Sequence, residues 1–147
     1  MARGRVKRIL ALAGHQVSLG LAGPGDDVGV WGRSPLAWRG EAVAARRGAA
    51  LVRIEDAFLR SIRPGRMGEP PLGLLIDWRG VHFDPSVPSD LEHLLASHPL
   101  DDPALLARAS VGMARLIAAD LSKYNLHDPA LAPPDPGYVL EIGRAHV

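Results

Sequence analysis

The fold is decided by residues 28–56, which read VGVWGRSPLAWRGEAVAARRGAALVRIED. Residues 28–31 and 50–54 are short apolar runs that favour buried strands. The residues between them predict a helix. A strand, a helix and a second strand in so few residues form a βαβ unit, whose crossover favours parallel, right-handed pairing. We therefore predict an α/β fold.

The helix of this unit is expected to begin beside Ser34 and to end near Arg47. Ser34 has the side chain of an N-cap, and Pro35 would take the first helical position, where no backbone N–H is needed. Gly48 can adopt the left-handed conformation that commonly ends a helix. The turn before the helix contains no G-x-G-x-x-G and no Walker lysine, which excludes a dinucleotide fingerprint and a P-loop.

The rest of the chain supplies further elements. We expect a strand over residues 72–77 and a hairpin partner over residues 81–84. Two helices follow, one capped by Ser89 and one that begins at Asp102. Tyr138 opens a last strand.

Composition limits the class of protein. The chain has 147 residues, the size of one ordinary domain, and it has no cysteine. Disulfides and thiolate metal sites are therefore excluded. The apolar runs are too short to span a bilayer or to form a signal peptide, so we expect a cytoplasmic protein.

Charge is unevenly distributed along the chain. Residues 1–66 carry 12 Lys or Arg against 5 Asp or Glu, whereas residues 67–147 carry 5 against 11. The basic part could face an anionic partner, or the two parts could pair with each other. Because the basic residues are scattered and lack interleaved aromatic residues, we do not expect nucleic-acid binding.

The segment around Glu55 and Asp56 has the strongest chemical signal. Both carboxylates follow a strand, at the edge where open α/β sheets place ligands, and Arg53 and Arg60 flank them with opposite charge. Carboxylates accept hydrogen bonds from sugar hydroxyls, and a guanidinium binds a carboxylate or phosphate with two N–H groups. The alternative is an ion-pair cluster that only holds a loop.

Other polar residues have weaker signals. Arg33 lies where a helix amino terminus favours an anion, although a structural turn is the alternative. Lys123 could face an anionic acceptor, or its segment could form a helix C-cap at Asn125. Asp77 and Asp84 bracket a turn, and turn residues are the simpler interpretation. The histidines show no ligand spacing, so we assign no metal. The predicted substrate-binding residues are Arg33, Glu55, Asp56, Arg60, Ser61 and Lys123.

Six segments in order resemble the bacterial capsular polysaccharide biosynthesis family, and in particular its KpsC-type β-Kdo transferases. The resemblance runs from about Val28 to Leu140, and the segments are Val30–Pro35, Val52–Ser61, Gly68–Leu72, Asp77–Asp84, Pro88–Glu92 and Asp120–Leu126. Typical members have glycine where this chain has Ala57, serine at Gly73, and tyrosines near His82 and Phe83. A backbone that needed positive φ at residue 57 would be strained by alanine.

The resemblance implies a GT-B glycosyltransferase of two Rossmann-like domains. Residues 1–140 would be the amino-terminal domain, a truncated Rossmann-like half-module that is inactive alone. Such enzymes transfer Kdo from CMP-Kdo to a lipid-linked glycan acceptor and build the linker on which capsule is assembled and exported. Peripheral association with the inner-membrane assembly and export complex is also implied. A non-catalytic module that binds sugar or polyanion is the alternative.

The catalytic machinery is expected to lie beyond this chain. In the family, a carboxylate nucleophile follows the strand that begins here at Tyr138, and the CMP-binding domain comes later, so we assign no catalytic residue and no cofactor. Residues 141–147 read EIGRAHV. The DNA sequence GAG ATC GGA AGA GCA CAC GTC, which matches a common sequencing adapter, encodes this string, so we expect a scar that takes no part in the fold.

Overall fold

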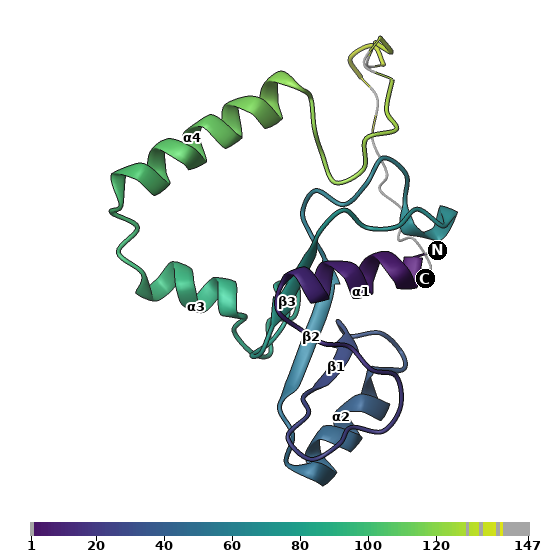
Figure 1. Ribbon diagram of the computed structural model, residues 1–147. Coiled ribbons are helices and arrows are strands. Elements are labelled where there is room, and N and C mark those ends of the chain that lie inside the picture. Colours follow the sequence, from purple (N-terminus) through teal and green to yellow (C-terminus); the bar gives the residue numbers. More distant parts are fainter. Residues whose placement is uncertain (1, 129, 133, 138, 140–147) are drawn as a thin grey trace.

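The computed structural model describes residues 2–128, 130–132, 134–137 and 139. Its centre is a sheet of three strands in the order β1 (Val28–Trp31), β2 (Leu51–Asp56) and β3 (Leu74–Asp77) (Figure 1). β1 and β2 are parallel, with Val28 opposite Leu51, which confirms the predicted βαβ pairing. β3 is antiparallel to β2. The protein is therefore an α/β protein with a small mixed sheet.

Helix α2 (Ala37–Arg47) connects the two parallel strands, but it begins later than predicted. Its N-cap is Leu36, and no side chain caps it, so the prediction for Ser34 and Pro35 was wrong. The reason is a turn in which the Ser34 N–H donates to the Trp31 carbonyl and the Ser34 carbonyl accepts from Ala37 N, both at 2.9 Å. Gly48 ends the helix as predicted, with φ of 63°.

The predicted hairpin partner at residues 81–84 was also wrong, because these residues form a turn. The Asp77 carboxylate at the end of β3 accepts the N–H groups of Arg79 and Gly80, at 2.8 and 2.7 Å. Its second oxygen accepts Asp90 N at 2.8 Å. These bonds direct the chain toward the next helix instead of back along β3. These contacts agree with the interpretation of Asp77 as a turn residue.

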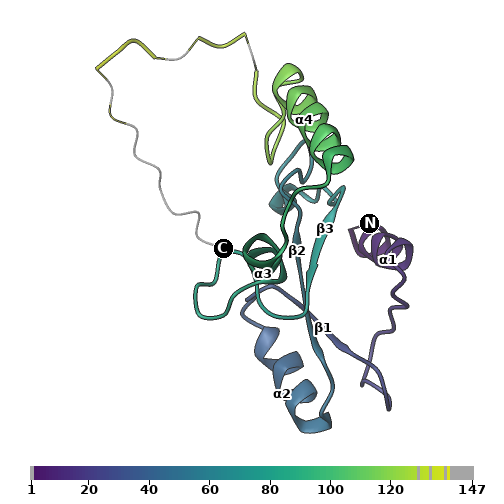
Figure 2. The ribbon, with the colours of Figure 1, turned by 90° about the vertical axis from the view of Figure 1, so that its left-hand side faces the viewer.

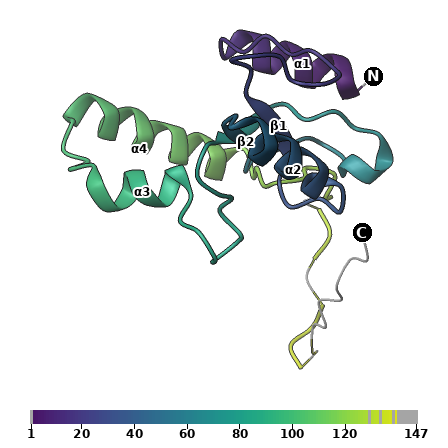
Figure 3. The ribbon, with the colours of Figure 1, turned by 90° about the horizontal axis from the view of Figure 1, so that it is seen from below.

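Helices α3 (Asp90–Ser97) and α4 (Pro103–Ala118) confirm the two predicted helices and both caps. Ser89 and Glu92 form a capping box, and the Asp102 carboxylate accepts from the first turn of α4. The hydrogen bonds from the Ser89 N–H and hydroxyl lower the pKa of Glu92. Both helices extend away from the sheet (Figures 1 and 3), and neither has a buried side chain within the described chain.

The buried apolar residues lie around the sheet. α1 (Ala2–Leu12) and α2 lie on opposite sides of it (Figure 2). The most buried apolar residues are Leu10 of α1, Ala37 and Ala44 of α2, Val30 and Val52 of the strands, and Val81. Among the described residues, no helix combines the length and the apolar character that crossing a membrane would require. Tyr138 and Leu140 of the expected last strand, and the scar expected at residues 141–147, fall outside the described residues.

Candidate functional site

The carboxyl ends of β1 and β2 meet at one edge of the sheet because the two strands are parallel. Gly32 follows β1 there, and its N–H donates to the Ile54 carbonyl at 2.8 Å. Glu55 lies directly over Gly32, since a Cβ at Gly32 would be 2.2 Å from Glu55 Oε2. The φ of Gly32 is +40°, so both the backbone and the space favour glycine. The other oxygen, Glu55 Oε1, accepts Asp56 N at 2.9 Å.

Arg60 is the centre of a buried polar cluster behind this edge. Its Nε donates to Asp56 Oδ2 at 2.6 Å, in a pair whose side chains are 8% and 16% exposed. Its Nη1 donates to Ser61 Oγ and to the Glu69 carbonyl, at 2.8 and 2.9 Å. The guanidinium lies against Gly65, where a Cβ would be 2.4 Å from Nη2. Arg60 therefore links three parts of the loop between β2 and β3.

The segment around Lys123 joins this cluster through its backbone. The Lys123 carbonyl accepts the N–H groups of Arg60 and Ser61, at 3.1 and 3.3 Å, whereas its Nζ lies 6.0 Å from the Tyr124 ring centroid. Sequence reasoning missed the role of Asn125, whose N–H donates to the Ile62 carbonyl at 2.9 Å. Asn125 is not the C-cap of α4, which is Ala119. This long-range contact has no local signal in the sequence.

Arg53 forms its ion pair with a carboxylate of α2, not with Asp56. Its Nη2 pairs with Glu41 of α2 at 2.7 Å, and its Nη1 donates to the Gly32 carbonyl at 2.8 Å. Successive side chains of a strand point to opposite faces, so Arg53 and Asp56 of β2 face different sides. Of the two arginines predicted to flank Glu55 and Asp56, only Arg60 forms an ion pair with one of them, whereas Arg53 pairs with Glu41.

Arg33 connects the turn after β1 to the turn after β3. Its guanidinium pairs with Asp84, and its Nη2 donates to Ser86 Oγ at 3.0 Å. Hydrogen bonds from the hydroxyl and the N–H of Ser86, together with that from Arg33, lower the pKa of Asp84 to about 2. The Arg33 side chain remains 45% exposed, so part of the guanidinium still faces solvent.

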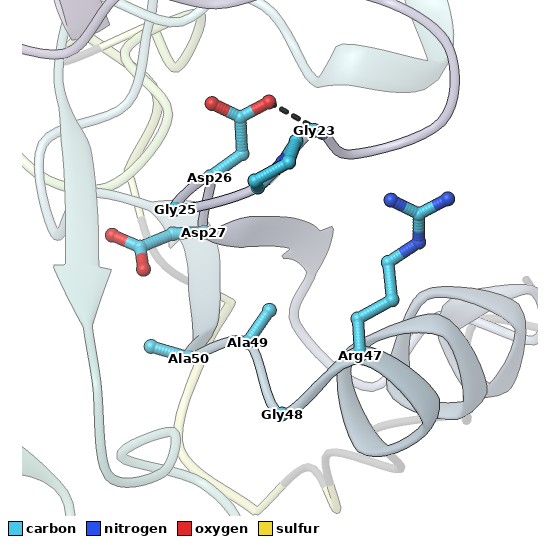
Figure 4. A pocket seen from close by; sticks show the side chains of 9 residues that line it. Gly23, Gly25, Asp26, Asp27, Arg47, Gly48, Ala49 and Ala50 are labelled. Carbon is cyan, nitrogen blue, oxygen red and sulfur yellow. Dashed lines mark hydrogen bonds between the residues drawn. The ribbon is translucent and has the colours of Figure 1, made fainter.

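Two hollows are lined by other residues. One, of about 310 Å³, is at the opposite edge of the sheet, where Asp26, Asp27 and Arg47 surround Gly48 (Figure 4). The Arg47 guanidinium donates to the Ala22 carbonyl there. The other, of about 740 Å³, lies between the α1 region and the strands, and Leu10 and Ile54 are among its lining residues. Neither hollow contains a predicted site residue. In the described part of the chain, no three His, Asp or Glu side chains are grouped to hold a metal ion.

Residues 57 and 73 face each other across the loop that leaves β2. Ala57 N donates to the Gly73 carbonyl at 3.4 Å, and a Cβ at Gly73 would lie 3.2 Å from the Ala57 Cβ. Ala57 is not among the positive-φ residues of the described chain, so it carries no such strain. Two Cβ atoms, one at each position, would be crowded. This agrees with the combination of Ala57 and Gly73 in this chain, where the resemblance implied glycine at 57 and serine at 73.

A double-mutant cycle tests this exchange. We expect Gly73→Ser to destabilise the chain by about 1 kcal/mol through overpacking, and Ala57→Gly/Gly73→Ser to be more stable than the sum of the single changes predicts. Urea unfolding followed by circular dichroism measures each free energy. Additive single changes would contradict the proposed contact.

Comparisons with known proteins agree with this fold. The family model described as "Capsule polysaccharide biosynthesis protein" matches residues 26–135. The capsule polysaccharide modification protein LipA of Neisseria meningitidis serogroup B is 35% identical over 106 residues, which are 72% of this chain and 15% of LipA. The lipopolysaccharide-processing protein LpsZ of Rhizobium meliloti is 39% identical over 106 residues, 69% of this chain and 24% of LpsZ.

A solved structure is also similar. KpsC of Thermosulfurimonas dismutans, a β-Kdo 2,4 transferase, superimposes with a TM-score of 0.65 at 30% identity, over 76% of this chain and 33% of KpsC. The fold together with these matches defines an α/β protein of the capsule polysaccharide class. The chain belongs to the capsule polysaccharide biosynthesis family, of the KpsC type. It spans between about a seventh and a third of the length of these relatives.

Proposed function

We propose that this chain is the amino-terminal part of a capsule glycosyltransferase that transfers Kdo from CMP-Kdo to a lipid-linked glycan acceptor. The observation that carries the proposal is its similarity, in both sequence and fold, to the β-Kdo transferase KpsC. In this proposal the whole enzyme has the GT-B architecture of two Rossmann-like domains. The β1–α2–β2 unit belongs to the first domain, and the nucleophile and the CMP site belong to parts of the longer protein outside the matched region. The enzyme works in the cytoplasm, at the inner-membrane assembly and export complex.

The six predicted residues divide into two groups by their contacts. Glu55 and Arg33 lie at the carboxyl edge with part of each side chain facing solvent, and the Lys123 side chain is exposed. These three can meet a sugar hydroxyl or a carboxylate directly. Glu55 accepts hydrogen bonds from hydroxyls, and Arg33 and Lys123 attract a carboxylate.

The other group consists of Asp56, Arg60 and Ser61, which act as positioning residues. Arg60 and Ser61 are buried, and their polar atoms bond to protein groups. Asp56 follows Glu55 directly, so the Asp56–Arg60 pair fixes the backbone that carries the Glu55 carboxylate. The Oδ1 of Asp56 is buried and has no hydrogen-bond partner among the described residues.

The test uses a full-length relative that carries the Glu-Asp pair and transfers Kdo. We expect the Glu55→Gln equivalent to lower kcat/KM at least tenfold, because the neutral amide is a weaker acceptor for a sugar hydroxyl. The Asp26→Asn equivalent, at the opposite edge of the sheet, is the control and should keep its activity. Transfer is measured from CMP-Kdo to a synthetic acceptor. Unchanged transfer by the Glu55→Gln equivalent would contradict a role of Glu55 in substrate binding.

A further inference from the structure

Three aromatic rings from two separate turns meet at the carboxyl edge of the sheet. His82 lies between Phe58, which follows β2, and Phe83, with ring centroids 5.5 and 5.2 Å apart. The His82 and Phe83 rings meet edge to face, at 86°. Such contacts hold rings in a fixed arrangement. Nevertheless Phe58 is 60% and Phe83 51% exposed, so the cluster presents ring surface to solvent and does not fill the core.

This aromatic cluster lies next to the polar residues of the edge. The point where a Cβ of Gly32 would stand is 3.5 Å from Phe83 Cζ and 2.2 Å from Glu55 Oε2. An aromatic ring and a carboxylate oxygen therefore flank the same glycine. A single exposed phenylalanine would need no explanation, but three clustered rings beside a carboxylate indicate a binding surface.

Arg33 adds a guanidinium to the same surface, where it is paired with Asp84. It follows Gly32 in the chain, and its pair with Asp84 ties it to the residue that follows Phe83. The Arg33 side chain is 45% exposed, so this pair does not remove it from solvent. The surface thus combines apolar ring faces, the Glu55 carboxylate as a hydrogen-bond acceptor, and a half-exposed guanidinium paired with Asp84.

We propose that the aromatic cluster Phe58, His82 and Phe83 is a subsite for one acidic pyranose of the acceptor glycan. The electropositive C–H face of the sugar lies on the negative face of the rings, Glu55 accepts a hydroxyl, and Arg33 binds the carboxylate. The inference rests on the proposed function, since that function makes a glycan the ligand. It goes further by naming the surface and the class of sugar. No bond is made or broken there.

Saturation-transfer NMR on the complete chain tests the proposal, with the methyl glycoside of Kdo as the acidic probe and methyl galactoside as the neutral one. We expect Phe83→Ala and Phe58→Ala each to weaken binding of the acidic probe roughly three- to tenfold, since each removes one stacked ring. Trp38→Ala is the matched control, because Trp38 is equally exposed, at 60%, and lies on α2. Phe83→Leu keeps an apolar side chain without the ring and should behave like Phe83→Ala.

The charge arm compares Arg33→Gln with Arg63→Gln, an exposed arginine elsewhere in the chain. Only Arg33→Gln should abolish the preference for the acidic probe over the neutral one. No binding of the Kdo glycoside by the unaltered chain, or equal binding by the unaltered chain and all Phe variants, would overturn the proposal. These readouts do not involve transfer, so the subsite and the enzymatic function can fail separately.

Discussion

Arg60→Met should lower the free energy of unfolding of this chain by about 3–5 kcal/mol. The arginine pairs with Asp56 at 2.6 Å, with only 8% of its own side chain exposed. Removing it leaves the Asp56 carboxylate buried without its partner, and it also removes the donors to Ser61 Oγ and the Glu69 carbonyl. An unpaired buried charge costs far more than the loss of an exposed pair.

Urea unfolding followed by circular dichroism measures this loss. Arg63→Met is the matched control, since Arg63 is an exposed arginine of the same loop and should change the free energy by less than about 0.5 kcal/mol. The double variant Asp56→Leu/Arg60→Met should recover much of the loss, because it removes both charges. If Arg60→Met and Arg63→Met unfold at the same urea concentration, Arg60 does not hold the loop.

Gly40→Ala and Gly112→Ala should change stability in opposite directions, although both glycines lie inside helices. Alanine favours a helix over glycine by about 0.5–1 kcal/mol, and Gly112 of α4 has open space around it. Gly112→Ala should therefore stabilise the chain. Gly40 of α2 packs on β1, where a Cβ would be 2.3 Å from Val30 Cγ1. Overpacking there costs about 1–3 kcal/mol, which exceeds the helix gain.

Thermal and urea unfolding of the two variants test this pair. Val30 is buried, so it cannot turn away into solvent, and α2 must shift on the sheet to admit the methyl group. The Gly40→Ala/Val30→Ala variant should lose less than the sum of its single changes, because the second truncation makes room for the first. A stabilising Gly40→Ala would show that α2 is not in close contact with β1.

The sequence by itself determined the elements whose signals are local. Two apolar runs, a helix between them and Gly48 were enough to predict the parallel pairing of β1 and β2, because a short crossover permits little else. Ser89 and Asp102 marked the starts of α3 and α4 through bonds to N–H groups two or three residues away. The six ordered segments also identified the family, which the comparisons confirmed.

Only the tertiary structure decided which charges meet. Arg53 and Arg60 are equivalent in the sequence around Glu55 and Asp56, yet strand alternation sends Arg53 to α2, and the loop buries Arg60 against Asp56. Likewise, no local pattern places Asn125 against Ile62, Arg33 against Asp84, or Phe58 against His82. These contacts join residues far apart in the chain, so they depend on where the turns lie in space.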